Sequence, residues 1–121
     1  MTAVAEPYVE VCRLGDLPED KAVQYVVGGD YLAVVRTQGE VFAISDYCSH
    51  ADVSLSEGDV EDCHLECWMH GSRFDLRTGR PDSPPAVRPV PVHDVLVDGE
   101  GPDARILINP HPREEKPDVQ S

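Results

Sequence analysis

Positive charge is scarce in this chain. Lys and Arg together number 10 against 23 Asp and Glu, which gives a formal net charge of -13 and a pI near 4.5. Such a surface repels the phosphate backbone of DNA or RNA, so nucleic acid is excluded as a partner. Two interpretations of the acidity remain open. It can simply keep a small protein in solution, or it can steer the protein toward basic patches on other proteins.

Long hydrophobic runs are also missing. No apolar segment approaches the roughly 20 residues that a membrane-spanning helix needs, and residues 1–7 lack the basic start and the apolar stretch of a secretory signal. We therefore expect a soluble, cytoplasmic protein without membrane contact. In that reducing compartment the four cysteines more often bind metal or react than form crosslinks. The 121 residues suffice for one domain with a single modest core.

The chain does contain a series of short, strand-like segments separated by turn residues, which is typical of an all-β domain. The predicted strands are residues 8–13, 21–27, 31–36, 41–45, 59–66, 73–76, 92–97 and 105–108. Gly28-Gly29-Asp30 is a strong hairpin signal, and five prolines within residues 81–91 exclude a helix or central strand there. A three-stranded meander thus leads directly toward Cys48.

Two short motifs, Cys48-Ser49-His50 and Cys67-Trp68-Met69-His70, supply two thiols and two imidazoles. Sixteen residues separate His50 from Cys67, so each Cys–His pair can leave one loop, and two facing loops can hold a binuclear iron cluster. Structural zinc is an alternative, although zinc sites more often pair Cys with Cys and His with His. A disulfide between Cys48 and Cys67 is a third interpretation, which the reducing compartment disfavours.

The order and spacing of these motifs resemble the Rieske ferredoxin family. The likeness extends to the sequence His-Gly-Ser-x-Phe-Asp at residues 70–75 and to Ser83-Pro84-Pro85-Ala86, which is similar to the family's proline loop. It implies an antiparallel β-sandwich with a small cluster-binding subdomain, about residues 46–86, made of two hairpin loops. It also implies one [2Fe-2S] cluster per chain, in which Cys48 and Cys67 bind one iron and His50 and His70 bind the other.

The resemblance covers residues 8–109, so we expect a flexible N-terminus over residues 1–7 and a disordered tail over residues 110–121. The remaining histidines, His64, His93 and His111, form no convincing site for the mononuclear iron of an oxygenase. The chain is therefore interpreted as an electron carrier and not as an enzyme.

The family implies that a carrier of this kind passes single electrons from a flavin-dependent ferredoxin reductase to a partner oxygenase, and we expect the carrier to be a monomer. Two alternatives remain. One is an accessory redox protein of iron–sulfur cluster assembly, and the other is a small Rieske subunit of a larger oxidoreductase such as nitrite reductase.

Several residues near the motifs receive other roles. Cys63 is expected to point away from His64 in one continuous strand and not to bind metal, and Cys12 to be a small buried hydrophobe. Trp68 is expected to shield the cluster, with electron relay through the aromatic ring as the alternative. Asp46 is expected to be a solvated loop carboxylate, with partner docking as the alternative. Ser72 is a candidate hydrogen-bond donor to a cluster sulfur, with turn capping as the alternative.

Overall fold

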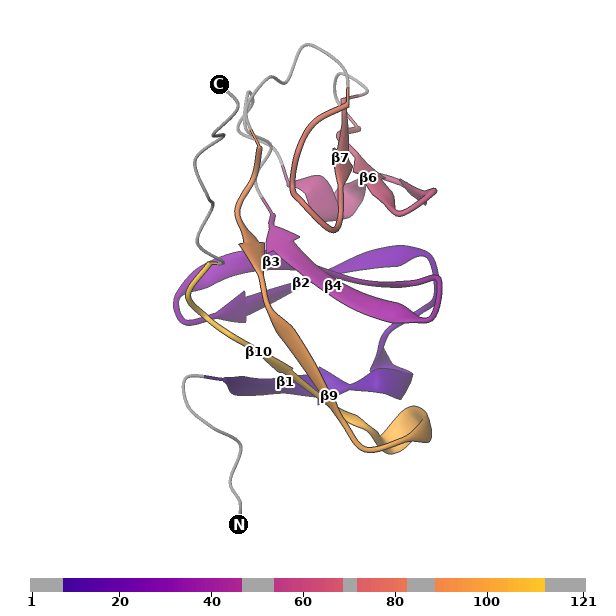
Figure 1. Cartoon of the computed structure of the whole chain (residues 1–121), viewed down its shortest axis with the longest axis vertical. Coiled ribbons are helices and arrows are strands. Elements are labelled where there is room, and N and C mark those ends of the chain that lie inside the picture. The colour runs from indigo at the N-terminus through magenta and orange to yellow at the C-terminus, as the bar shows by residue number, and fades with distance from the viewer. Residues whose placement is uncertain (1–7, 47–53, 69–71, 83–88, 113–121) are drawn as a thin grey trace.

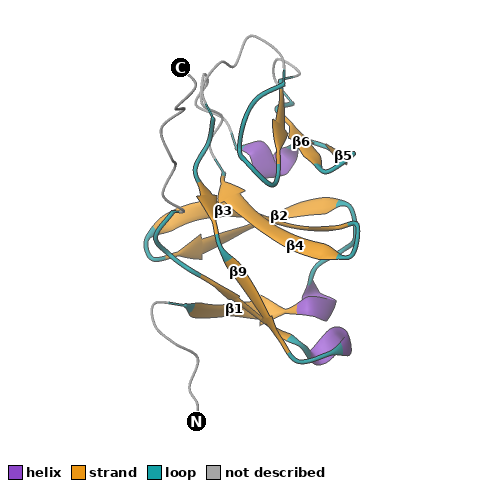
Figure 2. Cartoon of the chain, viewed as in Figure 1, coloured by secondary structure: helices purple, strands orange, loops and turns teal. Residues whose placement is uncertain are grey.

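Residues 8–46, 54–68, 72–82 and 89–112 are described in the structure, which is a computed structural model. This part of the chain contains no α-helix, only strands and three single-turn 3-10 helices (Figure 2). The strands form three antiparallel sheets. Two of them face each other as a sandwich, and the third lies on the far side of the larger one (Figure 1). The predicted antiparallel all-β fold is therefore confirmed.

The larger sheet is built on the predicted meander. It contains β2 (Lys21–Val27), β3 (Asp30–Thr37) and β4 (Glu40–Ser45), with the short β8 (Val92–His93) along the edge of β4. Gly28 and Gly29 join β2 to β3 with φ values of 61° and 89°. Positive φ at both turn positions is what a two-residue type I′ hairpin requires, so the glycine pair fixes this register.

The second sheet of the sandwich has the order β1-β10-β9, from β1 (Val9–Arg13), β10 (Arg105–Ile108) and β9 (Val95–Asp98). The 3-10 helices η1 (Leu14–Asp16) and η3 (Gly101–Asp103) lie at its ends. Apolar side chains from both sheets, together with Leu17 at the end of η1, fill the space between them: Leu17, Val27, Leu32, Val34, Ala43, Ile106 and Ile108.

The predicted strand over residues 92–97 is wrong, because the chain changes sheets at Asp94. β8 pairs with β4, whereas β9 pairs with β10. The buried His93 spans the two sheets, since its Nδ1 lies 2.8 Å from the carbonyl oxygen of Asn109, just after β10. A single straight strand cannot pair in both sheets, so the break is required by the sandwich.

The third sheet contains β5 (Val60–Glu61), β6 (His64–Glu66) and β7 (Arg73–Asp75), and η2 (Leu55–Glu57) precedes it. We call η2 and these three strands the upper subdomain. Its apolar side chains share one core with the upper face of the larger sheet: Ala33, Val35, Ile44, Leu55, Cys63, Leu65, Cys67, Phe74, Leu76, Val90 and Val92.

The predicted single strand over residues 59–66 is also wrong. The chain reverses at Asp62 and Cys63, whose φ values are 54° and 61°, so β5 and β6 form a tight hairpin. Neither residue is glycine, which is why the turn is not evident from the sequence. Asp is nevertheless among the residues that tolerate the left-handed region best.

The predicted flexible N-terminus lies outside the described residues, as does most of the predicted tail. Within the described ranges, no helix is long and apolar enough to cross a membrane.

Candidate metal centre

Of the four predicted ligands, the structure describes Cys67, while Cys48, His50 and His70 lie outside the described residues. Cys67 directly follows β6 and is completely buried. Its backbone N–H donates a 2.7 Å hydrogen bond to the carbonyl oxygen of Ser72, which leads into β7. The β6–β7 hairpin therefore fixes the backbone at Cys67, and the rigid strands position the start of the second motif.

Asp46 stands two residues before Cys48 in the sequence, and its environment contradicts the expectation of a solvated carboxylate. Asp46 is completely buried. Its Oδ1 accepts a 2.6 Å hydrogen bond from the backbone N–H of Ser56, and its Oδ2 accepts bonds from Ser56 Oγ (3.0 Å) and Gln24 Nε2 (2.5 Å). These contacts leave no local signal in the sequence, because both partners are distant from Asp46 along the chain.

Described residues close to the two motifs in the sequence share one core. Leu55, on the return side of the first motif, and Phe74, which follows the second, both pack in the core of the upper subdomain with Cys67. Ser72 is buried as well, and its carbonyl closes the turn at Cys67. Shared packing therefore places Leu55, Cys67 and Phe74 in one core.

Cys63 is buried but lies in the β5–β6 turn, so the expected alternation with His64 within one strand is wrong. Its Sγ accepts a 2.8 Å hydrogen bond from Arg77 Nη1. Burial raises the pKa of the Cys63 thiol, and the Arg77 charge opposes this effect only partly. A thiol held protonated is a poor metal ligand, because metals bind the thiolate. This environment suits a packing role.

Trp68, inside the second motif, leaves half of its surface exposed. The expected shielding role can therefore involve only the buried half of this side chain.

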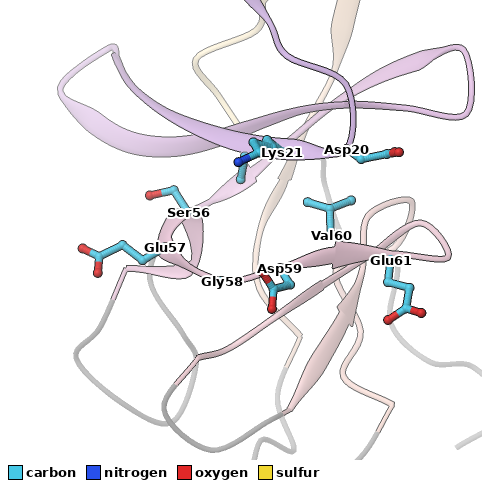
Figure 3. A pocket seen from close by; sticks show the side chains of 9 residues that line it. Asp20, Lys21, Ser56, Glu57, Gly58, Asp59, Val60 and Glu61 are labelled. Carbon is cyan, nitrogen blue, oxygen red and sulfur yellow. The ribbon is translucent and has the colours of Figure 1, made fainter.

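A groove of about 540 Å³ runs between the start of β2 and the upper subdomain (Figure 3). Acidic residues dominate its walls, with Lys21 as the lining cation. The lining residues are Asp20, Lys21, Ala22, Ser56, Glu57, Gly58, Asp59, Val60 and Glu61. Part of the chain's negative charge is therefore concentrated beside the upper subdomain.

The described residues by themselves bring together no group of three His, Cys, Asp or Glu that could hold a metal ion. The donor set of the two motifs nevertheless fits an iron–sulfur cluster. Cys67 offers a thiol that water does not reach, at a backbone turn held by a hydrogen bond. Two thiolates and two imidazoles are the ligands of a Rieske centre.

The Rieske [2Fe-2S] domain family matches residues 7–94, and the chain belongs to this family. The biphenyl 2,3-dioxygenase ferredoxin component of Rhodococcus jostii is 39% identical over 99 residues, which cover 76% of this chain and 92% of the relative. The chain is accordingly a Rieske ferredoxin, an electron-transfer protein and not itself a catalytic enzyme, with one [2Fe-2S] cluster.

Solved structures agree with this assignment. The ferredoxin of carbazole 1,9a-dioxygenase from Nocardioides aromaticivorans has a TM-score of 0.80 and 40% identity, over 86% of this chain and 98% of the other. A ferredoxin seen in complex with the reduced oxygenase of a carbazole 1,9a-dioxygenase has a TM-score of 0.81 and 29% identity, over 92% of this chain and 100% of the other. Two nitrite reductase small subunits, 20% and 24% identical, share the fold alone.

Proposed function

We propose that this ferredoxin carries single electrons from a flavin-dependent reductase to the terminal oxygenase of a dioxygenase that attacks an aromatic substrate. The observation that carries the proposal is the likeness to ferredoxin components of such systems over nearly their whole length. A structural neighbour bound to an oxygenase supports the choice of partner. The cluster, when bound, takes up and releases one electron at a time.

We further propose that Cys48 and Cys67 bind one iron as thiolates and that His50 and His70 bind the other as neutral imidazoles. The buried position of Cys67 and its backbone hydrogen bond to Ser72 support this assignment, because a ligand must be held rigidly and kept from water. The cluster-binding subdomain would then be residues 46–86 within a domain of residues 8–109. We propose a monomer that works in the cytoplasm.

The role of a nitrite reductase subunit is less well supported. The small subunits that share the fold are 20% and 24% identical, which is well below the 39% and 40% of the ferredoxin components. No observation on this chain favours a role in cluster assembly over electron supply to an oxygenase.

Cys67→Ala and Cys63→Ala form a matched pair that tests the ligand assignment. Both thiols are buried in the same core and lie four positions apart in the sequence, so the two substitutions remove similar packing. We expect Cys67→Ala, like Cys48→Ala, to lose the cluster and the visible absorption. Cys63→Ala should keep two irons per chain and the reduced-state EPR signal of mixed His and Cys ligation. Iron and zinc analysis with EPR after dithionite checks this.

Full iron content in Cys67→Ala would contradict the ligand set, as would one zinc in place of two irons. Loss of iron in Cys63→Ala would show that the assignment has chosen the wrong thiol. Transfer of electrons to the oxygenase is tested separately, by mixing the reduced protein with purified terminal oxygenases and following the oxidation of the ferredoxin.

A further inference from the structure

We propose that Asp46 is a positioning residue for the cluster, which it serves by clamping both ends of the first ligand loop. The proposal rests on the assignment of Cys48 and His50 as ligands made above. The loop leaves the larger sheet directly after Asp46 and returns at Leu55, where η2 begins. Both proposed ligands lie within this span of eight residues.

The two ends of the loop are joined to each other through Asp46. The backbone carbonyl of Asp46 accepts a 2.6 Å hydrogen bond from the N–H of Leu55, and its carboxylate accepts the N–H and the hydroxyl of Ser56. Leu55 is itself completely buried in the core that contains Cys67. The width of the loop at its base is therefore set by three hydrogen bonds to one residue.

Asp46 also fixes the loop to the larger sheet. Its backbone N–H donates a 3.0 Å hydrogen bond to the carbonyl of Tyr31 in β3, and its Oδ2 accepts the side-chain amide of Gln24 in β2. The same residue thus contacts β2, β3 and η2. A shift of Asp46 relative to the larger sheet or to η2 would require several of these bonds to break together.

The chemistry of the carboxylate favours a positioning role over a contribution to stability alone. Among the described residues, its donors are a backbone N–H, a hydroxyl and a side-chain amide, and none of these is a cation. A buried carboxylate is costly unless its lone pairs are satisfied, and an apolar residue of similar size would often be no less stable. A carboxylate can accept several hydrogen bonds at two oxygens, which an apolar residue cannot.

The test compares Asp46→Ala, Asp46→Asn and Thr37→Val in the full-length protein with its cluster. Asp46→Ala removes every side-chain bond of the clamp. Asn can keep the N–H of Ser56 on its carbonyl, and its amide can donate to Ser56 Oγ and to a rotated Gln24. Thr37→Val is the matched control, because it removes a part-buried 2.6 Å side-chain hydrogen bond from the buried Thr37 to Asp20 at the opposite end of β3.

The measurements are the rate of iron release to a ferrous chelator and the EPR spectrum after dithionite reduction. Loss of a residue that orients metal ligands typically costs roughly 10- to 100-fold in metal affinity. We expect iron release from Asp46→Ala to accelerate by about that factor, with broadened EPR features. Asp46→Asn should restore most of the wild-type behaviour, and Thr37→Val should release iron at the wild-type rate.

Equal iron release from Asp46→Ala and Thr37→Val would overturn the proposal, as would an Asn variant as defective as the Ala variant. If Asp46→Ala does not fold, Gln24→Ala removes one clamp partner and should accelerate iron release to a smaller extent. A wild-type rate in Gln24→Ala would then count against the clamp.

Cys48→Ala separates this proposal from the ligand assignment. If Cys48→Ala keeps two irons, the assignment fails whatever the Asp46 variants do. If Cys48→Ala loses the cluster while Asp46→Ala behaves like Thr37→Val, only the clamp fails.

Discussion

At the scale of single residues, the hydroxyl of Tyr25 and the thiol of Cys12 form a hydrogen-bonded pair in the sandwich. Burial raises the pKa of Tyr25 to about 12, from 10.0, and the bond to Cys12 adds to the effect. Burial raises the pKa of Cys12 as well. The folded protein therefore favours the neutral forms of both groups.

Because of this pair, the free energy of unfolding should decrease at alkaline pH. A raised folded-state pKa stabilises the fold fully below pH 10, and the contribution disappears as the pH rises toward about 12. We expect Tyr25→Phe to lose less stability than the wild type over this interval, because it lacks the ionising hydroxyl. Urea unfolding at several pH values between 10 and 12 measures the difference. Parallel pH curves for the two proteins would rule out the Tyr25 contribution.

At the residue scale the sequence identified the motifs but not what supports them. Cys67 was predicted as a ligand from its spacing to His70, which is local information. Asp46 was misinterpreted because its burial depends on Gln24 and Ser56, which are 22 and 10 residues away. Long-range partners of this kind leave no local pattern in a sequence.

At the scale of secondary-structure elements, Gly58 ends η2 at a point of close backbone approach. A Cβ added there would lie 1.7 Å from the carbonyl oxygen of Glu66, the residue before Cys67. The φ of Gly58 is -92°, which any residue can adopt, so the restriction is one of space. Backbone atoms cannot move aside as a flexible side chain can.

We expect Gly58→Ala to destabilise the protein by about 3 kcal/mol, the upper part of the usual range for overpacking. The shift of Glu66 should also disturb Cys67 and lower the iron content. Gly39→Ala is the control: its φ of 77° strains an alanine, but no atom lies within 4 Å of the added Cβ. That variant should lose about 1–2 kcal/mol and keep its iron. Iron analysis and chemical unfolding of both variants test these expectations. Equal iron loss in the two variants would contradict a specific effect of Gly58 on Cys67.

The elements that the sequence predicted well are those bounded by strong turn residues. Gly28 and Gly29 define the β2–β3 hairpin, and β2 has the predicted bounds. The two strands that were predicted too long break at Asp62-Cys63 and at Asp94, where no glycine or proline interrupts the apolar pattern. The first break is a strained turn, and the second follows from which sheet each half joins. Tertiary context determines both.

At the scale of the whole molecule, the net charge of -13 dominates encounters with other proteins. We expect electron transfer from the reduced protein to the basic haem protein cytochrome c to slow as ionic strength rises, because salt screens the attraction. Ferricyanide is the matched control, since repulsion between two anions is screened by the same salt and its rate should increase. Stopped-flow kinetics with both oxidants measures the two slopes. Slopes of the same sign would show that charge does not steer the encounter.

The fold class was accessible from the sequence because the cluster motifs resemble one family and the strand pattern agrees with it. The relative placement of the three sheets could not be predicted from the sequence. It depends on which faces of β3 and β4 bury their side chains, and a strand buried on both faces shows no alternation from which to assign a direction.

β3 is such a strand. Leu32 and Val34 pack toward the sandwich, and Ala33 and Val35 pack toward the upper subdomain, all with no more than 1% of their surface exposed. A larger or smaller side chain at any of these four positions would disturb the packing on the face of the sheet toward which it points. Of the described strands, β3 should therefore accumulate amino-acid substitutions most slowly as related sequences diverge. Substitutions that fit the protein to new partners should therefore occur on its exposed surface, while the buried residues of β3 stay nearly unchanged.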